Sequence, residues 1–282
     1  MDIDSLLDKL GLPPVFQRFG VRILVVIVIL VAATGVFFEG LESYELRFQE
    51  RLCGEYCERN YDCPVQHFPN QPMNTYSNIA YLVFGLWALR LRRPPTLPQY
   101  TFAALSGLLF VGSGYFHGAV TVRGHFLDVI GMVILFSFMA MYAIWCTHHL
   151  GRYWISAILG LLVAVPLSIW AWDGGSGTIL GILAVAILIQ MVYAWWCNRR
   201  FGWRIIAIML TFAGAFTFRQ WDINRSLCDP DWWFQGHAMW HILSALGLYL
   251  IFVFFNKYRY ADTGELPEYT GLNPRGVSKP GK

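Results

Sequence analysis

The chain has 282 residues, of which 56% are hydrophobic and only 14% are charged. Soluble domains carry about 25% charged residues, so this composition excludes an ordinary soluble globular protein and indicates an all-α integral membrane protein. The net charge is only +3, and the sequence shows no basic face for nucleic acid. We therefore expect the molecule to be embedded in the membrane, with no nucleic acid partner.

Residues 1–20 are predicted to form a cytoplasmic or interfacial segment, in which Leu6, Leu7 and Leu10 share one helical face. A first apolar span follows at residues 21–38. An alternative is a cleaved signal peptide ending near Ala32. The acidic leading region and the apolar residues after that point favour an uncleaved membrane anchor instead.

We predict eight spans, each close to the roughly 20 apolar residues that cross a bilayer. They cover residues 21–38, 74–91, 100–117, 126–146, 154–172, 181–196, 203–218 and 237–255. With a cytoplasmic N-terminus, 15 of the 21 Lys and Arg residues fall inside and 6 fall outside. This bias is typical of membrane proteins and puts both termini in the cytoplasm. The polar tail at 257–282 is predicted to be disordered.

The loop at 39–73 is the longest of the predicted outer loops and is rich in Cys, Pro and acidic residues. Because the outer compartment is oxidising, its cysteines are expected to form disulfides, although free thiols are an alternative. The outer cysteines are Cys53, Cys57, Cys63 and Cys228. In the third span, glycines at 112, 114 and 118 indicate close helix packing, with a cofactor-binding loop as the weaker interpretation.

Two histidines of the last span, His237 and His241, are four residues apart and therefore share one helical face. His117 ends the third span at the same predicted depth and side of the membrane. Three protein ligands with one open position are typical of a catalytic zinc ion. Ser113 and Asp128 lie at this depth too. Each residue has a simpler interpretation: helix–helix hydrogen bonding for a histidine, helix capping for Asp128 and packing for Ser113.

These residues resemble the alkaline ceramidase family, which belongs to a superfamily of seven-helix membrane hydrolases that also includes adiponectin-type receptors. The resemblance covers roughly residues 55–258. The motifs that carry it are Asn74-Thr-Tyr-Ser-Asn78, Ser113-x3-His117-x10-Asp128, His237-Ala-Met-Trp-His-Ile-Leu, Trp221-Asp-Ile-Asn and Cys57-Glu-Arg-Asn-Tyr61. It implies a seven-helix catalytic bundle at 74–256, so the span at 21–38 would be an extra helix.

The resemblance also implies roles for single residues. Zinc would be held by His117, His237 and His241, Asp128 would handle the proton of the attacking water, and Ser113 would stabilise the oxyanion. A disulfide would join Cys57 to Cys228, which leaves Cys53 and Cys63 for a second bridge. Calcium would bind where this chain has Glu55, Tyr56, Glu58, Asn60 and Gln71. The family has a carboxylate at position 71, so the amide here puts calcium in doubt.

We therefore expect a zinc-dependent amidohydrolase that cleaves ceramide, or a related lipid amide, to a fatty acid and a sphingoid base. The active site is expected near the periplasmic or lumenal side. The alternative is a receptor or lipid-sensing protein with a structural zinc ion. A structural site normally has a fourth protein ligand, and none is apparent in the sequence unless Asp128 serves. A transporter is disfavoured because the sequence shows neither inverted repeats nor matching broken helices.

Overall fold

The computed structural model describes residues 55–59, 68–92, 95–148, 160, 176–197, 202–226 and 228–261. Several predicted segments lie outside the described residues: the N-terminal segment, the extra span at 21–38, most of the outer loop, nearly all of the span at 154–172 and the tail beyond 261. The number of spans therefore stays a prediction.

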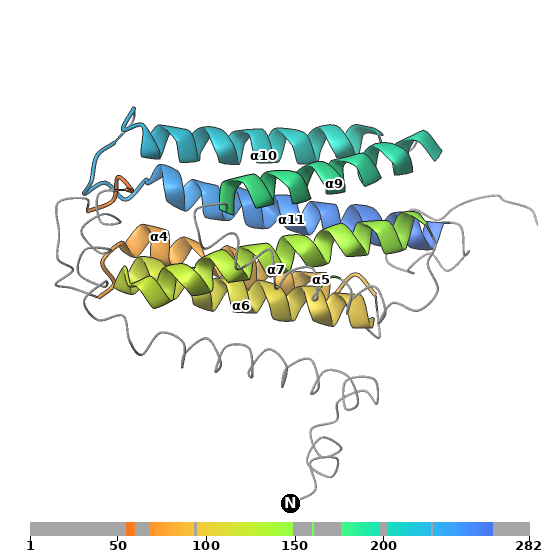
Figure 1. The fold of residues 1–282 in the computed structure, drawn as a ribbon, viewed down its shortest axis with the longest axis horizontal. Helices are drawn as coiled ribbons and strands as arrows, with labels where there is room; N and C mark the ends of the chain where they lie inside the picture. The colour runs from red at the N-terminus through yellow and green to blue at the C-terminus, as the bar shows by residue number, and fades with distance from the viewer. Residues whose placement is uncertain are drawn as a thin grey trace, which may run out of the picture.

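All regular elements among the described residues are helices, which agrees with the predicted all-α class. They run roughly along the long axis of the molecule (Figure 1). In chain order they are α4 (Pro72–Ser77), α5 (Ile79–Ala88), α6 (Leu97–Ala119), α7 (Val122–Thr147), α9 (Ser176–Cys197), α10 (Gly202–Ile223) and α11 (Gly236–Ala261).

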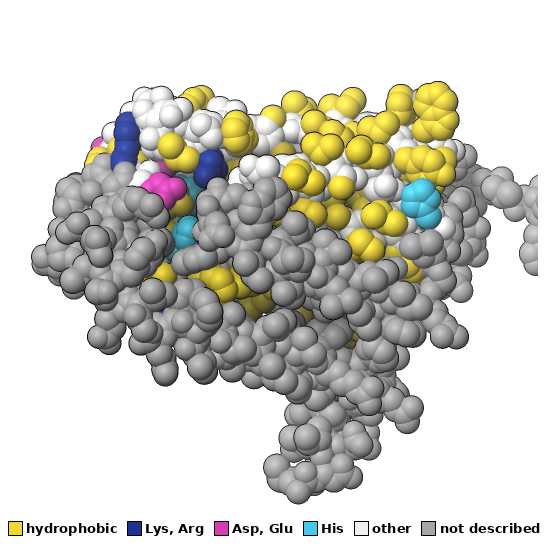
Figure 2. All heavy atoms as spheres, in the orientation of Figure 1, with side chains coloured by type: hydrophobic (Ala, Val, Ile, Leu, Met, Phe, Trp, Pro, Cys, Tyr) yellow, Lys and Arg dark blue, Asp and Glu magenta, His cyan; other side chains and the backbone are white. Residues whose placement is uncertain are grey.

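Four of these helices, α6, α7, α9 and α11, are long and apolar enough to cross a membrane. They match the predicted spans at 100–117, 126–146, 181–196 and 237–255. The helix α10 covers the predicted span at 203–218 but is not among the four, because charged residues such as Arg204 and Arg219 lie near its ends. Figure 2 shows hydrophobic side chains spread along the exposed helices, as expected of a surface that faces lipid.

The predicted span at 74–91 is interrupted at Asn78, where α4 gives way to α5. The side chains of Ser77 and Asn78 both donate hydrogen bonds to the carbonyl of Asn74, at 3.0 and 2.8 Å. The backbone N–H of Asn78 instead points to the carbonyl of Tyr76. Such competition by polar side chains is a known cause of helix breaks. It leaves the Asn74 carbonyl available to a group outside its own helix.

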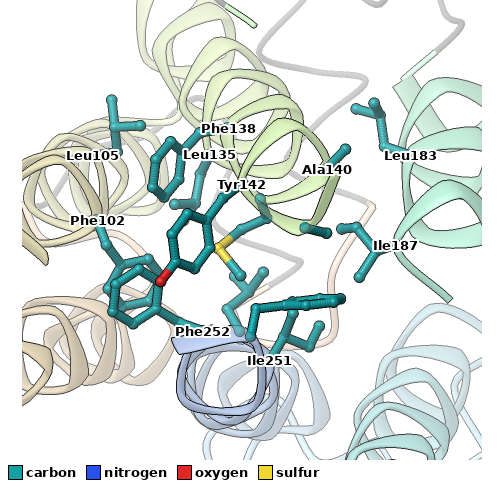
Figure 3. Packing of buried hydrophobic residues seen from close by; sticks show 14 of the residues in the cluster. Phe102, Leu105, Leu135, Phe138, Ala140, Tyr142, Leu183, Ile187, Ile251 and Phe252 are labelled. Atoms are coloured by element: carbon teal, nitrogen blue, oxygen red, sulfur yellow. The ribbon is translucent and has the colours of Figure 1, made fainter. Parts of the chain in front are cut away.

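The core lies between α5, α6, α7, α9 and α11 and is built from stacked aromatic rings (Figure 3). The ring of Phe252 lies 4.6 Å from that of Phe102 and 4.9 Å from that of Tyr142, between centroids. Asn256 donates a hydrogen bond to the Tyr142 hydroxyl, so the polar end of this buried ring is satisfied.

The helices α6 and α7 approach closely at Gly112. A methyl group placed there would lie 2.8 Å from the carbonyl oxygen of Leu127. The predicted packing role therefore holds for Gly112. A methyl group placed at Gly118 would lie 2.6 Å from the ring of Phe68. At Gly114 it would make only an ordinary contact. The close approach at Gly112 brings the next residues of the two helices, Ser113 and Asp128, side by side.

We expect Gly112→Ala to destabilise the protein by about 1–3 kcal/mol, because the obstructing atom is backbone and cannot move aside. Gly107→Ala in the same helix is the matched control, since a methyl group there meets nothing within 4 Å. That change should stabilise the helix by up to about 1 kcal/mol. Thermal unfolding in detergent distinguishes the two, and equal melting temperatures would contradict the close approach.

Candidate metal centre

Three buried histidines meet at one end of the bundle, on the left of Figure 1, where α6 ends and α11 begins. His117 lies in the last turn of α6, and His237 and His241 lie in the first two turns of α11. One ligand atom from each lies within 4.8 Å of the others. The three rings are 4.6–4.9 Å apart between centroids. The structure thus brings together the three ligands that the sequence predicted.

Hydrogen bonds fix which nitrogen of two rings faces the cluster. The Nδ1 atom of His117 lies 2.7 Å from Oε1 of Gln71. The Nδ1 atom of His241 lies 2.8 Å from Oγ of Ser77 and 3.1 Å from the carbonyl oxygen of Asn74. A carbonyl oxygen only accepts, so we assign the proton to Nδ1 in both rings. Each ring then presents the lone pair of Nε2.

Within the three-histidine cluster, two ring nitrogens are buried without a hydrogen-bond partner among the described residues: Nε2 of His117 and Nδ1 of His237. An unsatisfied buried polar atom costs on the order of 1–3 kcal/mol, so two beside each other call for an explanation. A cation that accepts the lone pairs would supply it. Three imidazole nitrogens suit zinc and other borderline transition metals and do not suit calcium or magnesium, which prefer oxygen.

Ser113 and Asp128 are buried and lie beside this cluster in sequence and in space. The Ser113 side chain hydrogen-bonds the Asp128 carboxylate. Asp128 also interacts electrostatically with Tyr56 and Tyr81. The ring of Tyr56 lies 4.2 Å from that of His237, and the ring of Tyr81 lies 6.3 Å from that of His241. A hydroxyl and a carboxylate therefore lie at the same end of the bundle as the three imidazoles.

The segment around Cys57, in the predicted outer loop, packs against this end of the bundle. A disulfide joins Cys57 to Cys228, as the resemblance implied, whereas Cys53 and Cys63 lie outside the described residues. Asp222, at the end of α10, accepts hydrogen bonds from the backbone N–H groups of Cys57 (3.1 Å) and His237 (3.3 Å). One buried carboxylate thus connects the outer segment to the helix that carries two of the histidines.

Of the residues predicted to bind calcium, Glu55, Tyr56, Glu58 and Gln71 are described, and Asn60 is not. Burial raises the pKa of the Glu58 carboxyl, which is opposed by hydrogen bonds from the backbone N–H groups of Met73 (2.7 Å) and Asn74 (2.9 Å). Burial also raises the pKa of Tyr56. Both Glu58 oxygens therefore hold the start of α4. Calcium binding stays a prediction.

Ser77 and Asp222 were not predicted as neighbours of the histidines. Both belong to motifs that carried the resemblance, Asn74-Thr-Tyr-Ser-Asn78 and Trp221-Asp-Ile-Asn. Polar residues within or next to an apolar span usually have a functional role. That signal was present for both residues, but it does not say which partner each one binds.

Residues 54–276 match the family model named Ceramidase. The chain belongs to the ceramidase family. This ceramidase is also similar to an alkaline ceramidase of Caenorhabditis briggsae, with 23% identity over 258 residues that cover 76% of this chain and 84% of the relative. As the sequence predicted, the chain is a hydrolase that acts on amide bonds. The matched region includes the three histidines, Ser113 and Asp128.

We expect Asp222→Asn to lower the stability of the ceramidase by about 1–3 kcal/mol, because an amide offers only one acceptor oxygen to the two N–H groups that the carboxylate now serves. Asp229→Asn, an exposed acid of the same outer region, is the control and should change stability by less than about 0.5 kcal/mol. Thermal unfolding measures both. If the two variants have the same melting temperature, Asp222 does not hold the segment around Cys57 to α11.

Proposed function

We propose that this ceramidase is a zinc-dependent membrane hydrolase that cleaves the N-acyl bond of ceramide or a closely related lipid amide. The observation that carries the proposal is a set of three buried imidazoles beside a hydrogen-bonded serine and carboxylate, in which ring nitrogens of His117 and His237 have no hydrogen-bond partner among the described residues. The family match and the name of the nematode relative support the choice of substrate.

His117, His237 and His241 would hold the ion through one nitrogen each. Zinc in such a site supplies a Lewis acid and lowers the pKa of water to about 7, which makes hydroxide available near neutral pH. Among the described residues, the cluster contains no fourth His, Cys, Asp or Glu ligand. Three ligands and an open position favour catalysis over the alternative, a receptor with a structural zinc ion.

The polar residues beside the histidines divide the remaining chemistry. Asp128 takes a proton from the attacking water as the water oxygen bonds to the amide carbonyl carbon. Ser113 donates a hydrogen bond to the developing oxyanion. Asp128 then delivers the proton to the amide nitrogen as the C–N bond breaks. The products are a free fatty acid and a sphingoid base, so atoms and protons balance with water as the only co-substrate.

The site faces the periplasmic or lumenal side in this proposal, with both termini in the cytoplasm. The distribution of Lys and Arg over the predicted loops supports this orientation. Membrane-facing apolar helices next to the site suit a substrate with long acyl chains, because such a substrate already resides in the bilayer.

His241→Ala should abolish stoichiometric zinc binding and reduce ceramide hydrolysis by at least roughly a hundredfold, because a two-histidine site loses both the ion and its Lewis acidity. His148→Ala is the control, since this exposed histidine follows α7 at the opposite end of the bundle. Metal analysis and fatty acid release from purified protein give the two readouts. Zinc-free wild-type protein with full activity would contradict the proposal, and zinc-loaded protein without activity on any lipid amide would favour the receptor.

Asp128→Asn and Ser113→Ala should each lower kcat while zinc remains bound. We expect a loss of about 10²–10⁴-fold for Asp128→Asn, the usual contribution of a general acid–base, and about 10²-fold for Ser113→Ala. Ser106→Ala, a buried serine two turns earlier in α6, is the control for Ser113. Unchanged kcat in a zinc-loaded Asp128→Asn protein would exclude its role as the base.

A further inference from the structure

Gln71 meets His117 through both its side chain and its backbone. Its Oε1 atom lies 2.7 Å from Nδ1 of His117, and its backbone N–H donates to the carbonyl of His117 at 3.1 Å. The side chain is buried, with 1% of its surface exposed. Asn74 donates a second hydrogen bond to the same Oε1 atom, at 3.3 Å. The Gln71 amide is therefore enclosed and oriented toward the metal ligand.

The two lone pairs of this amide oxygen are both in use. An amide carbonyl has two acceptor sites, and here the Nδ1–H of His117 and the Nδ2–H of Asn74 take them. A calcium ion would need one of these lone pairs. A carboxylate has about four acceptor sites, so it could accept a hydrogen bond from a histidine and bind a cation at the same time. The amide oxygen at this position, which already accepts from Asn74, can do only one of the two.

We propose that Gln71 is a positioning residue for His117 in the zinc site and not a calcium ligand. The inference rests on the proposed zinc-dependent function. Gln71 fixes the proton of His117 on Nδ1 and turns Nε2 toward the other two histidines. Such outer partners of metal-bound histidines typically contribute 10–100-fold to metal affinity.

The short helix α4 gives the same support to a second ligand. Gln71 directly precedes this helix, and Asn74 and Ser77 within it hold Nδ1 of His241. Glu58 in turn holds the start of the helix through the N–H groups of Met73 and Asn74. A displaced α4 would therefore disturb two of the three ligands, and Gln71 is the residue whose side chain reaches His117.

Gln71→Leu and Gln71→Glu test the proposal, with zinc affinity measured by competition with a chelator. Gln71→Leu removes the acceptor and should weaken zinc binding about 10–100-fold. Gln71→Glu keeps an acceptor oxygen for His117 and should bind zinc at least as tightly as the wild type. Gln190→Leu is the control, because it removes a side-chain hydrogen bond of equal length, from Thr147, between α7 and α9. Its zinc affinity should be unchanged.

Thermal unfolding with added calcium gives a second readout that does not depend on activity. The wild type and Gln71→Leu should show no rise in Tm with calcium, whereas Gln71→Glu should gain one. A calcium-induced rise in the wild type that Gln71→Leu abolishes would overturn the proposal. So would equal zinc affinity in Gln71→Leu and Gln190→Leu.

The outcomes also separate this inference from the proposed function. Weakened zinc binding in Gln71→Leu, with a zinc-loaded wild type that hydrolyses no lipid amide, would support Gln71 as a positioning residue and refute the hydrolase. A wild type that binds no zinc would refute both. If Gln71→Glu retains the zinc affinity of the wild type and Gln71→Leu loses it, then Gln71 acts by orienting the imidazole of His117. A general packing role would not depend on an acceptor oxygen.

Discussion

The central constraint on this ceramidase is the placement of three imidazoles within 4.8 Å of one another inside a helix bundle. All three side chains are buried, so each ring nitrogen needs a hydrogen-bond partner or a metal ion. Nδ1 of His117 and of His241 find acceptors on Gln71, Asn74 and Ser77. Nε2 of His117 and Nδ1 of His237 find none among the described residues. Without a cation, these buried and unpartnered ring nitrogens would lower the stability of the fold.

The neighbouring structure follows from that requirement. At the break at Asn78 the Asn74 carbonyl accepts side-chain hydrogen bonds from Ser77 and Asn78 in place of a regular backbone bond, and Nδ1 of His241 lies 3.1 Å from the same oxygen. Two buried carboxylates, Glu58 and Asp222, accept N–H groups at the starts of α4 and α11, where helices leave donors unsatisfied. The disulfide at Cys57 holds the outer segment between these two points. The backbone around the three histidines is thus hydrogen-bonded by groups outside the helices that carry them.

Much of the site was predictable because it depends on helical spacing and on which helix ends lie together, and the sequence indicates both. A four-residue interval fixed the pairing of His237 and His241, and alternation of the spans put His117 at the same depth. The break at Asn78 was not predictable, since an apolar run does not reveal which side chains will compete for a carbonyl. The role of Asp222 was hidden for a similar reason: its two partners are backbone groups, 165 and 15 residues away.

The amide at position 71 has a consequence for the chemistry of the ion as well as for its retention. A carboxylate partner increases the basicity of a metal-bound histidine, and the more electron density a ligand donates, the weaker the Lewis acid becomes. A neutral amide orients His117 without that added charge. A zinc ion held in the proposed site would then keep more of its positive charge for the substrate carbonyl and for the attacking water. If position 71 serves the histidine alone, as proposed, then Glu58, Asp222 and the disulfide are the groups that hold α4, α11 and the segment around Cys57 in place.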